Sequence, residues 1–404
     1  MANKNLGAAR KAKNDEFYTQ FHDIQKEIEA YLEYDKNTFR DKIVYCNCDD
    51  PFESNFFRYF VLNFKRLGLK SLITTSYKPS PVANTQLGLF GDDKTLQPEK
   101  GRPKITANKF VINSVGDING DGSFSLQDIA EQLKANKNNE WEPLKGDGDF
   151  RSEECIELLK QSDIVVTNPP FSLFREYIGQ LVEYRKDFLI IGTLNALTYK
   201  EVFPLLKANK VWLGNNARVN GGAMFYEIPK AIANPEQVRE IRTSPEGREI
   251  YITRVQGVRW FTTLEHGRLH QPISLMTMSD NQKYNKKVQK SNAFYSPYDN
   301  YDAIEIPNVD AIPSDYDGVM GVPISFFDKY SPDQFEVLGT SDNGVIDDKY
   351  KLTPGLRQEF VDDYYKAGGT GSYKEGNPTA GFYEDGIAKM SYKRIFIRHR
   401  KAAL

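Results

Sequence analysis

The chain has 404 residues, of which 40% are hydrophobic and 27% are charged, and its formal net charge is −2. This is the composition of an ordinary water-soluble protein, and the length suits two domains of about 150 residues or more each. No apolar run approaches the roughly 18–20 residues that a membrane-spanning helix needs, and no apolar signal core follows the N-terminus. Three cysteines are too few for a disulfide framework, so we expect a cytoplasmic protein with no membrane partner.

Short apolar runs alternate with amphipathic stretches between residues 23 and 214, after a polar, basic arm over residues 1–14 that we expect to be flexible. Strands are predicted at 41–46, 69–74, 110–115, 163–167, 188–192 and 210–214. Helices are predicted at 23–34, from an N-cap at Ser54 to residue 64, and at 129–133, 154–160, 173–184 and 203–207. This alternation is typical of an α/β fold with an open, mostly parallel, Rossmann-like sheet.

The pattern changes after residue 215. Asn220-Gly221-Gly222 has the composition of a tight turn, and 250–253 and 259–262 are predicted antiparallel strands. We therefore place a domain boundary between residues 215 and 240. The predicted organisation is the arm over 1–14, a first domain over 15–230 with an insertion at about 78–140, and a C-terminal α+β region over 231–404.

The most informative motif is Asn168-Pro169-Pro170-Phe171, which follows the predicted strand at 163–167. Two consecutive prolines cannot donate hydrogen bonds to a β-ladder, so the chain must leave the sheet there. The Asn168 amide oxygen and the Pro169 carbonyl could accept both protons of an exocyclic amino group, which leaves its lone pair free to attack an electrophile. Phe171 offers a face on which a planar base can stack.

This run resembles the catalytic motif of S-adenosylmethionine-dependent amino methyltransferases. Most of that class act on adenine N6 in DNA, and others act on an RNA base or on a glutamine side-chain amide of a protein. The resemblance implies that Asn168, Pro169, Pro170 and Phe171 are catalytic and that S-adenosylmethionine is the cofactor. It implies no need for a metal, because the sulfonium is already a strong electrophile. The alternative is an ordinary turn that ends a strand.

Ligands of an open α/β sheet lie beyond the carboxyl ends of its strands, so residues at those ends are the candidates for holding the cofactor. The first predicted strand is followed by Asn47, Asp49, Asp50 and Pro51, where an acid could hold the ammonium of a methionine moiety. The usual Gly-x-Gly loop is absent from this position. The second strand also lacks the acid that many such sites use for the ribose hydroxyls.

Two further segments are candidates for the same site. The turn Gly146-Asp147-Gly148-Asp149-Phe150 lies one helix before the strand at 163–167. Asp149 could accept a hydrogen bond from the cofactor's adenine amino group while Phe150 packs on the ring; the alternative is a surface Asp-Gly turn. Phe17-Tyr18-Thr19 resembles the N-terminal cofactor motif of modification methyltransferases, which implies that Tyr18 and Thr19 lie near the methionine carboxylate.

Taken together, the motifs resemble the adenine-specific DNA methyltransferases of the EcoRI methylase family. The matching stretches are 15–20, 43–51, 54–60, 146–152, 163–178, 188–205, 219–225, 257–266 and 320–330. The resemblance implies methyl transfer to adenine N6 in a specific duplex sequence, with the target base flipped out of the helix. It also implies a monomer able to serve in a restriction–modification pair, with residues 231–404 as the DNA target-recognition region.

Two side signals lie in the predicted insertion. Gln86-Leu87-Gly88-Leu89-Phe90 resembles the pentapeptide by which bacterial replication proteins dock on the sliding clamp. The alternative is a loop pinned to its own domain by its apolar side chains. Residues 117–128 have the spacing of a calcium-binding loop, but the segment before them is predicted as a strand rather than a helix. A plain turn is the alternative there.

Three clusters of basic residues stand out against the near-neutral net charge. Such clusters are usually solvated faces, and in a base-modifying enzyme they are also what phosphate contacts need. They are Lys4, Arg10, Lys11 and Lys13; Lys283, Lys286, Lys287 and Lys290; and Lys393, Arg394, Arg398, His399, Arg400 and Lys401.

Two other functions remain open from the sequence. The first is an amino methyltransferase that acts on RNA or on a protein glutamine, against which the long second half of the chain argues. The second is a non-enzymatic binding module with a relict methyltransferase domain, against which the intact Asn-Pro-Pro-Phe run argues.

Overall fold

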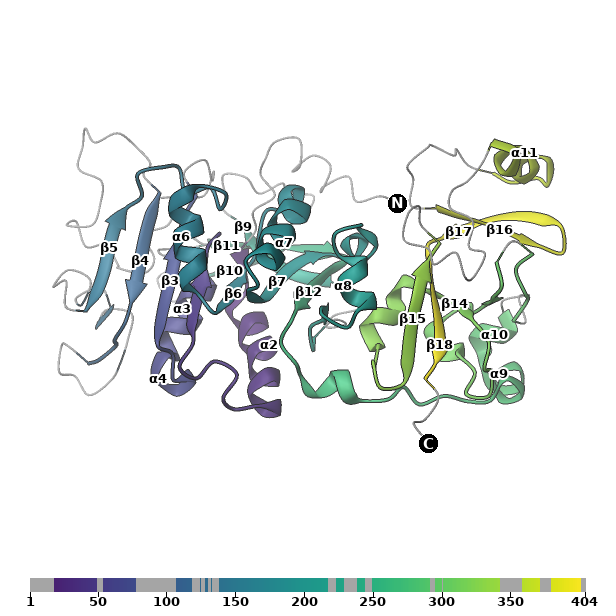
Figure 1. Cartoon of the computed structure of the whole chain (residues 1–404), viewed down its shortest axis with the longest axis horizontal. Helices are drawn as coiled ribbons and strands as arrows, with labels where there is room; N and C mark the ends of the chain where they lie inside the picture. Colours follow the sequence, from purple (N-terminus) through teal and green to yellow (C-terminus); the bar gives the residue numbers. More distant parts are fainter. Residues whose placement is uncertain are drawn as a thin grey trace. The chain divides into compact units, whose positions relative to one another are not determined.

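The chain folds as two compact units, Met1–Ala196 with Leu213–Gly267 (unit 1), and Leu197–Trp212 with Arg268–Leu404 (unit 2) (Figure 1). The structure, a computed structural model, describes residues 18–48, 54–77, 107–117, 124, 128–129, 132, 138–216, 223–228, 238–243, 249–290, 295–299, 301–341, 358–370 and 379–400. The predicted domain boundary lies near residue 230, whereas unit 1 continues to Gly267. Within the described ranges, no helix has the length and apolar character needed to cross a membrane.

The largest sheet has eight strands in the order β5-β4-β3-β2-β6-β7-β12-β8. The four central strands β3, β2, β6 and β7 are parallel to one another, whereas β4, β5 and β12 join antiparallel to their neighbours. The strands are β2 (Ile43–Cys46), β3 (Ser71–Thr75), β4 (Asn108–Ile112), β5 (Asn139–Pro143), β6 (Ile164–Thr167), β7 (Asp187–Thr193), β8 (Trp212–Leu213) and β12 (Val258–Thr262). The expected mostly parallel sheet is therefore a mixed one, because the insertion and the segment after residue 256 add antiparallel strands.

Helices precede and separate the parallel strands of unit 1 along the chain, as the sequence predicted. They are α2 (Phe21–Tyr34), α3 (Asn55–Leu62), α4 (Phe64–Leu67), α6 (Glu153–Gln161) and α7 (Phe174–Glu183), with the 3-10 turn η1 (Phe171–Leu173). A second 3-10 turn, η2 (Leu194–Thr198), begins in unit 1 and ends in unit 2. The predicted N-cap is confirmed, because Ser54 Oγ accepts from the backbone nitrogens of Phe56 and Phe57 at 3.1 and 3.3 Å. The helix ends earlier than predicted, at Asn63, whose amide Nδ2 donates to the Tyr59 carbonyl at 2.9 Å.

Side chains of the central strands alternate between the two faces of the sheet, so both faces are buried. Val44 and Val166 belong to the large core that includes the aromatic residues of α3. Tyr45 points to the opposite face, where it lies beside Cys155 of α6. Each such buried side chain contributes about 1.5–3 kcal/mol, which fixes the register of the strands that lead to the site.

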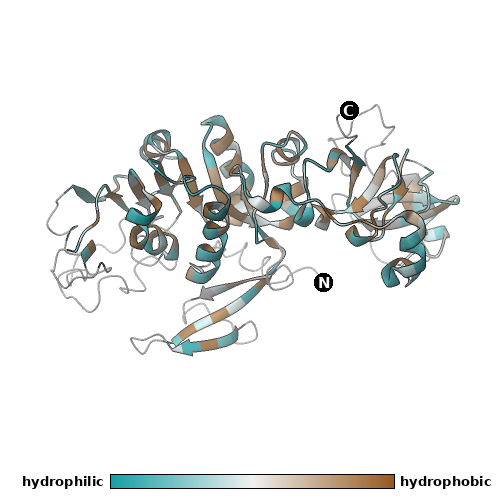
Figure 2. Cartoon of the chain, turned by 90° about the horizontal axis from the view of Figure 1, so that it is seen from below, coloured by the Kyte–Doolittle hydropathy of each residue, from teal (hydrophilic) through white to brown (hydrophobic). Residues whose placement is uncertain are grey.

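Unit 1 carries a second, four-stranded antiparallel sheet in the order β1-β9-β11-β10. Its strands are β1 (Tyr18–Thr19), β9 (Ala223–Ile228), β10 (Val238–Thr243) and β11 (Glu249–Gln256). Figure 2 shows this sheet leaving the body of unit 1, with alternating hydrophilic and hydrophobic positions along its strands. It joins the N-terminal strand to a segment about 200 residues later in the chain.

Unit 2 contains a four-stranded sheet in the order β13-β14-β18-β15 and a separate hairpin, β16-β17. Its strands are β13 (Ile304–Glu305), β14 (Met320–Pro323), β15 (Phe335–Thr340), β16 (Thr379–Glu384), β17 (Ile387–Tyr392) and β18 (Arg394–His399). Its helices are α8 (Phe203–Lys207), α9 (Met278–Tyr284), α10 (Lys286–Lys290) and α11 (Gln358–Lys366), and its 3-10 turns include η6 (Val309–Ala311) and η7 (Ile324–Lys329). The turn η5 (Gly267–His270) begins at the last residue of unit 1.

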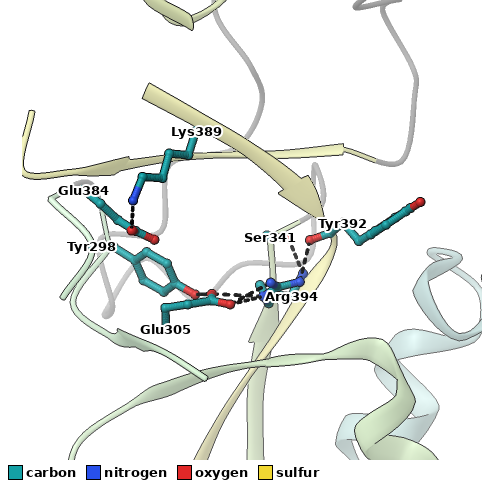
Figure 3. Close-up of polar contacts among 7 residues, drawn as sticks. All are labelled: Tyr298, Glu305, Ser341, Glu384, Lys389, Tyr392 and Arg394. Carbon is teal, nitrogen blue, oxygen red and sulfur yellow. Dashed lines mark hydrogen bonds and ion pairs between the residues drawn. The ribbon is translucent and has the colours of Figure 1, made fainter. Parts of the chain in front are cut away.

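A buried ion pair stabilises the junction of this sheet and the hairpin (Figure 3). Arg394 Nη2 lies 2.6 Å from Glu305 Oε1, and both side chains are about nine-tenths buried. Tyr298 donates its hydroxyl proton to the same carboxylate. Removing either charge would leave the other buried and unpaired, a change that costs about 3–5 kcal/mol.

Most described residues of the third basic cluster, residues 393–401, have their partners within unit 2. Arg398 Nη2 binds Glu336 Oε2 at 2.8 Å, and His399 Nε2 lies 2.8 Å from the carbonyl oxygen of Pro313. The buried pair with Glu305 leaves Arg394 unavailable to a phosphate. Lys401 lies outside the described residues, as do Lys4, Arg10, Lys11 and Lys13 of the N-terminal arm.

Candidate active site

The order of the parallel strands reverses between β2 and β6, which is where an open α/β sheet has its ligand crevice. The chain passes from β2 outward to β3, and later returns to the other side of β2 to form β6. Loops that leave two strands at such a reversal go to opposite faces of the sheet, and the space between them is where open α/β sheets bind ligands. Val44 pairs with Ile164 and Tyr45 with Val165, so the carboxyl ends of β2 and β6 lie side by side at the crevice.

The predicted catalytic run lies at this point. β6 ends at Thr167, and Asn168 and Pro169, which follow it, are buried, with Asn168 6% exposed. The Pro170 carbonyl accepts a hydrogen bond from the Leu173 nitrogen at 3.0 Å, which begins the turn that leads into α7. Phe171 is half-buried and packs against the large core of unit 1. The prediction that the prolines end the strand is confirmed, and Phe171 keeps part of its ring accessible.

Asn47 lies on the other side of the crevice and is held by two neighbouring elements. Its side-chain oxygen accepts a hydrogen bond from the Tyr177 hydroxyl of α7. Its backbone carbonyl accepts a hydrogen bond from the Thr75 hydroxyl at 3.3 Å. The Tyr45 hydroxyl oxygen lies 3.0 Å from the Thr75 hydroxyl oxygen. These contacts tie the ends of β2 and β3 to the helix that follows the catalytic run. Asp49, Asp50 and Pro51 lie outside the described residues.

The turn at 146–150 crosses directly over the end of β3. Gly148 has φ +81°, and a Cβ placed on it would overlap the carbonyl oxygen of Ser76. Both the positive φ and this close approach require glycine. The turn that holds Asp149 and Phe150 is therefore placed at the same edge of the sheet as Asn47 and Asn168.

Asp149 is held by Arg151, a residue to which the sequence alone assigned no role. Arg151 donates to Asp149 from its backbone nitrogen at 2.8 Å, from Nε at 2.9 Å and from Nη2 at 2.7 Å. The hydrogen bonds from Arg151 lower the pKa of Asp149, so it is a carboxylate at neutral pH. An arginine closely following an Asp-Gly turn is the sequence signal that could have revealed this clamp.

Phe150 joins the turn to α7. Its ring meets Tyr177 edge-on at 5.0 Å between centroids, and the Arg151 guanidinium lies 5.3 Å from the Phe150 ring centroid. Gln180 Nε2 donates to the Phe150 carbonyl at 3.1 Å, and Arg151 Nη1 to Glu176 Oε2 at 2.7 Å. One helix therefore positions the catalytic run, the end of β2 and the 146–150 turn.

Thr19 is fixed at the start of α3, the helix that follows β2. Asn55 Nδ2 donates to the Thr19 carbonyl at 2.8 Å, and Thr19 pairs with Tyr226 of β9. The Thr19 hydroxyl is buried, and among the described residues it has no hydrogen-bond partner. The backbone of Tyr18 is part of β1, but its side chain is outside what the structure describes.

Asp163 holds the start of the catalytic strand. Its carboxylate accepts from the Ile43 nitrogen at 2.8 Å, and its own nitrogen donates to the Ile43 carbonyl at 2.9 Å. This residue therefore aligns β6 with β2 at the edge of the sheet opposite the crevice.

The predicted side sites are mostly beyond the described part of the chain. Gln86–Phe90 lies outside it, and of the candidate calcium loop only Asp117, Phe124 and Asp128 are described. Within the described residues, no three His, Cys, Asp or Glu side chains are grouped to hold a metal ion. A surface hollow of about 760 Å³ over β4 and β5, lined by 113–114 and 138–142, contains none of the predicted site residues.

The amino-acid sequence is similar to a family of known methyltransferases. The sequence model of the family described as Adenine-specific methyltransferase EcoRI matches residues 5–400. The chain is 40% identical over 338 residues to the Type II methyltransferase M.EcoRI of Escherichia coli, covering 83% of this chain and 89% of that protein. It is 34% identical over 332 residues to M.MpnI of Mycoplasma pneumoniae (82% and 83%) and 34% identical over 334 residues to M.MgeORF184P of Mycoplasma genitalium (82% and 84%), both named Type II methyltransferases. No solved structure matches.

Proposed function

The chain belongs to the EcoRI family of adenine-specific methyltransferases, and from this membership we propose that it methylates adenine N6 at a specific sequence of duplex DNA. The observation that carries the proposal is the position of Asn168-Pro169-Pro170-Phe171 at the end of β6, beside the crevice of the sheet. Adenine in a duplex reaches such a crevice only if it is flipped out, at a cost of a few kcal/mol. Modification within a restriction–modification pair is the biological role that this activity supports.

Asn168 and Pro169 hold the target amino group. The Asn168 side-chain oxygen and the Pro169 carbonyl each accept one of its two protons, so the nitrogen lone pair points away from both. The prolines fix the backbone there, which keeps the two acceptors at a constant separation. The accessible part of the Phe171 ring stacks on the flipped base. The site acts by positioning and by excluding water, which together can supply about 7–11 kcal/mol of the barrier.

Residues around the crevice fit S-adenosylmethionine, the methyl donor that the family implies. When bound, this cofactor supplies a methyl group on a positively charged sulfur. The buried Thr19 hydroxyl fits the methionine carboxylate, since a buried hydroxyl without a partner is costly unless a ligand bonds it. Asn47 is placed to contact the ammonium of the methionine moiety, and Asp49, Asp50 and Pro51, which follow it in the chain, stay predictions for the same contact. Asp149 and Phe150 fit the adenine, as acceptor and as packing surface.

The replacement Thr19→Val tests the cofactor assignment without relying on activity. Valine has the shape of threonine without the hydroxyl, so we expect the free protein to be as stable as the wild type or slightly more stable. Affinity for S-adenosylmethionine should fall by about 3- to 10-fold, the value of one hydrogen bond. Denaturant unfolding and calorimetric titration measure the two effects.

Thr75→Val is the matched control, because the Thr75 hydroxyl has partners inside the fold, Tyr45 and the Asn47 carbonyl. It should lower the free energy of unfolding by about 1 kcal/mol or more. A Thr19→Val protein that is destabilised like this control, with unchanged cofactor affinity, would contradict the assignment.

A basic surface on α9 and α10 supports a role for unit 2 in binding the duplex. Lys283, Lys286 and Lys287 are exposed, and the Lys283 ammonium lies 5.0 Å from the ring centroid of Tyr284, which is 60% exposed. Asp310 is a nearby acid, and it is paired with Lys287 at 3.0 Å and with Lys329 at 2.6 Å. Lysines with an exposed aromatic ring suit phosphate and sugar contacts, so the C-terminal region supplies part of the DNA-binding surface.

The double variant Lys283→Ala/Lys286→Ala should weaken binding to every duplex by a similar factor. Each phosphate contact that is lost should reduce the magnitude of the slope of log K against log salt by about 0.9, so the loss of both lysines should reduce it by up to about 1.8, because fewer counterions are released. Turnover at saturating DNA should be unchanged. Lys366→Ala is the control, since Lys366 is 77% exposed on α11 and paired with Asp363 of the same helix. A salt slope equal to that of the wild type would contradict this role.

The proposed activity is tested by methyl transfer from labelled S-adenosylmethionine to bacterial DNA that lacks adenine methylation. Label in N6-methyladenine after the nucleosides are separated would support both the chemistry and the substrate. Label only in RNA or in a protein amide would favour the alternative substrates.

The sliding-clamp interaction of Gln86–Phe90 stays a prediction, tested by capture of the clamp with wild-type protein and with the Leu89→Ala/Phe90→Ala variant.

A further inference from the structure

The hairpin of β10 and β11 is exposed along its β10 strand. Of the six residues of β10, Val238 is half-buried and the other five are exposed. Ile241 is 55% exposed, which is unusual for isoleucine in a strand. A two-stranded hairpin without a covered face is marginally stable by itself. Here it is supported because β11 pairs along β9, whose partner on the other side is β1.

The register of the hairpin sorts its side chains between the two faces. Residues directly opposite in an antiparallel pair lie on the same face. Ile241 is opposite Tyr251, so these two share one face. Arg242 is opposite Ile250 on the other face. Since neither face of β10 covers a core, the side chains of this strand are available to a partner that surrounds the hairpin.

The exposed side chains of the hairpin belong to residue types that commonly contact base edges in the major groove. Arg242 is oriented by Glu240, with Nε to Oε1 at 2.7 Å and Nη2 to Oε2 at 2.9 Å, and about half of each side chain is exposed. Arg239 and Arg254 are also exposed. A guanidinium held in a fixed plane suits a bidentate contact with guanine in the major groove, and Ile241 suits the methyl group of thymine.

We infer that the β10–β11 hairpin enters the major groove of the target duplex and that Arg242, oriented by Glu240, reads base edges there. The inference rests on the proposed function and adds a specificity-determining element to it. The major groove of B-DNA, about 12 Å wide, admits a two-stranded β-ribbon. The sheet that carries this ribbon also carries Thr19 at its opposite edge, so base reading and the proposed cofactor site share one scaffold within unit 1.

The test compares affinities for two duplexes at one salt concentration. The first contains the sequence that the wild-type enzyme methylates, found by sequencing its modified DNA, and the second is unrelated. Arg242→Ala should lose about 5- to 100-fold in affinity for the first duplex and little for the second, as expected for one bidentate base contact. Arg242→Lys keeps the charge without the planar fork, so it should lose specificity in the same direction. Fluorescence anisotropy gives both affinities.

Arg66→Ala is the matched control. Arg66 also pairs with a glutamate, Glu29, and its side chain is 47% exposed, but α4 lies before β3, at the edge of the sheet opposite the crevice. This control should leave both affinities unchanged.

Three results would overturn the inference. An equal loss on both duplexes for Arg242→Ala would indicate a phosphate contact, and no loss on either would place the hairpin away from DNA. A concentration-dependent dimer of the wild type that dissociates in the Arg242→Ala variant would make the exposed edge of β10 an interface between two copies. Failure of the proposed function would appear in the wild type itself, as DNA without N6-methyladenine, and would overturn both proposals.

Discussion

Replacing Asn168 by alanine is expected to reduce methyl transfer by about 10²–10³-fold, the usual effect of removing one preorganised polar group from an active site. The Asn168 side chain is buried at the end of β6, and in the proposed mechanism its amide oxygen accepts one proton of the target amino group. Affinity for S-adenosylmethionine should stay within about twofold, because the proposed cofactor residues lie on other elements. Single-turnover methyl transfer and calorimetric titration separate the two effects.

Asn63→Ala is the matched control for this prediction. The Asn63 amide donates to the Tyr59 carbonyl at 2.9 Å at the junction of α3 and α4, which lies before β3 at the edge of the sheet opposite the crevice. Its loss should lower stability by about 1 kcal/mol and leave turnover unchanged. An Asn168→Ala enzyme with full activity would refute the catalytic assignment.

The methyl-transfer activity of Phe171 variants should depend on whether an aromatic ring is kept at this position. Phe171→Ala removes the ring proposed to stack on the flipped base, worth about 1–3 kcal/mol, whereas Phe171→Tyr retains a ring and should retain most of the activity. Because Phe171 also packs against the core, unfolding measurements must accompany the kinetics. Equal activity of the alanine and tyrosine variants would argue against stacking.

The catalytic strand and its motif could be predicted because their signals are local. Ile164, Val165 and Val166 are β-branched and buried, and the prolines after Asn168 prevent the strand from continuing. The N-cap at Ser54 is equally local, since it depends on two backbone nitrogens within three residues. Motifs of this kind can be recognised in the sequence because they do not depend on contacts with distant parts of the chain.

Two of the antiparallel strands, β5 and β10, were not predicted because they lack a periodic apolar pattern, whereas β4, β11 and β12 overlap predicted strands. Within β5, Asn139 is the buried residue and the others are exposed or half-buried, so its sequence resembles a loop. β10 is exposed on both faces, which removes the alternation that identifies a half-buried strand. Both strands form because a neighbouring strand pairs with them, and that partner is not visible locally.

Long-range partners also decided which charged residues face solvent. Arg394 and Arg398 belong to a run of basic residues, but their partners Glu305 and Glu336 are 89 and 62 residues away in the chain. The lysines of α9 and α10 have a similar density of charge, yet Lys283 and Lys286 stay exposed. Counting charge along a sequence could not separate these two clusters, because their difference lies in the folded partners.

Replacing Gly148 by alanine should be among the most damaging single changes in unit 1. The backbone there has φ +81°, and the new Cβ would overlap the carbonyl oxygen of Ser76. A non-glycine residue at positive φ costs about 1–3 kcal/mol, and relieving the clash requires the turn or the end of β3 to move, at a similar cost. We expect the free energy of unfolding to fall by about 2–6 kcal/mol in total. Denaturant unfolding measures this directly.

The same change should weaken the cofactor site, since the turn carries Asp149 and Phe150 to the edge of the sheet where Asn47 and Asn168 lie. A displacement that costs about 1.4 kcal/mol of binding free energy would raise the dissociation constant for S-adenosylmethionine tenfold. Gly146→Ala is the internal control two residues away, because nothing lies within 4 Å of the added Cβ. If both variants bind the cofactor as the wild type does, the turn at 146–150 supports the fold without contacting the cofactor. If only Gly148→Ala loses affinity, the contact of this turn with the end of β3 is what positions Asp149 and Phe150 for binding.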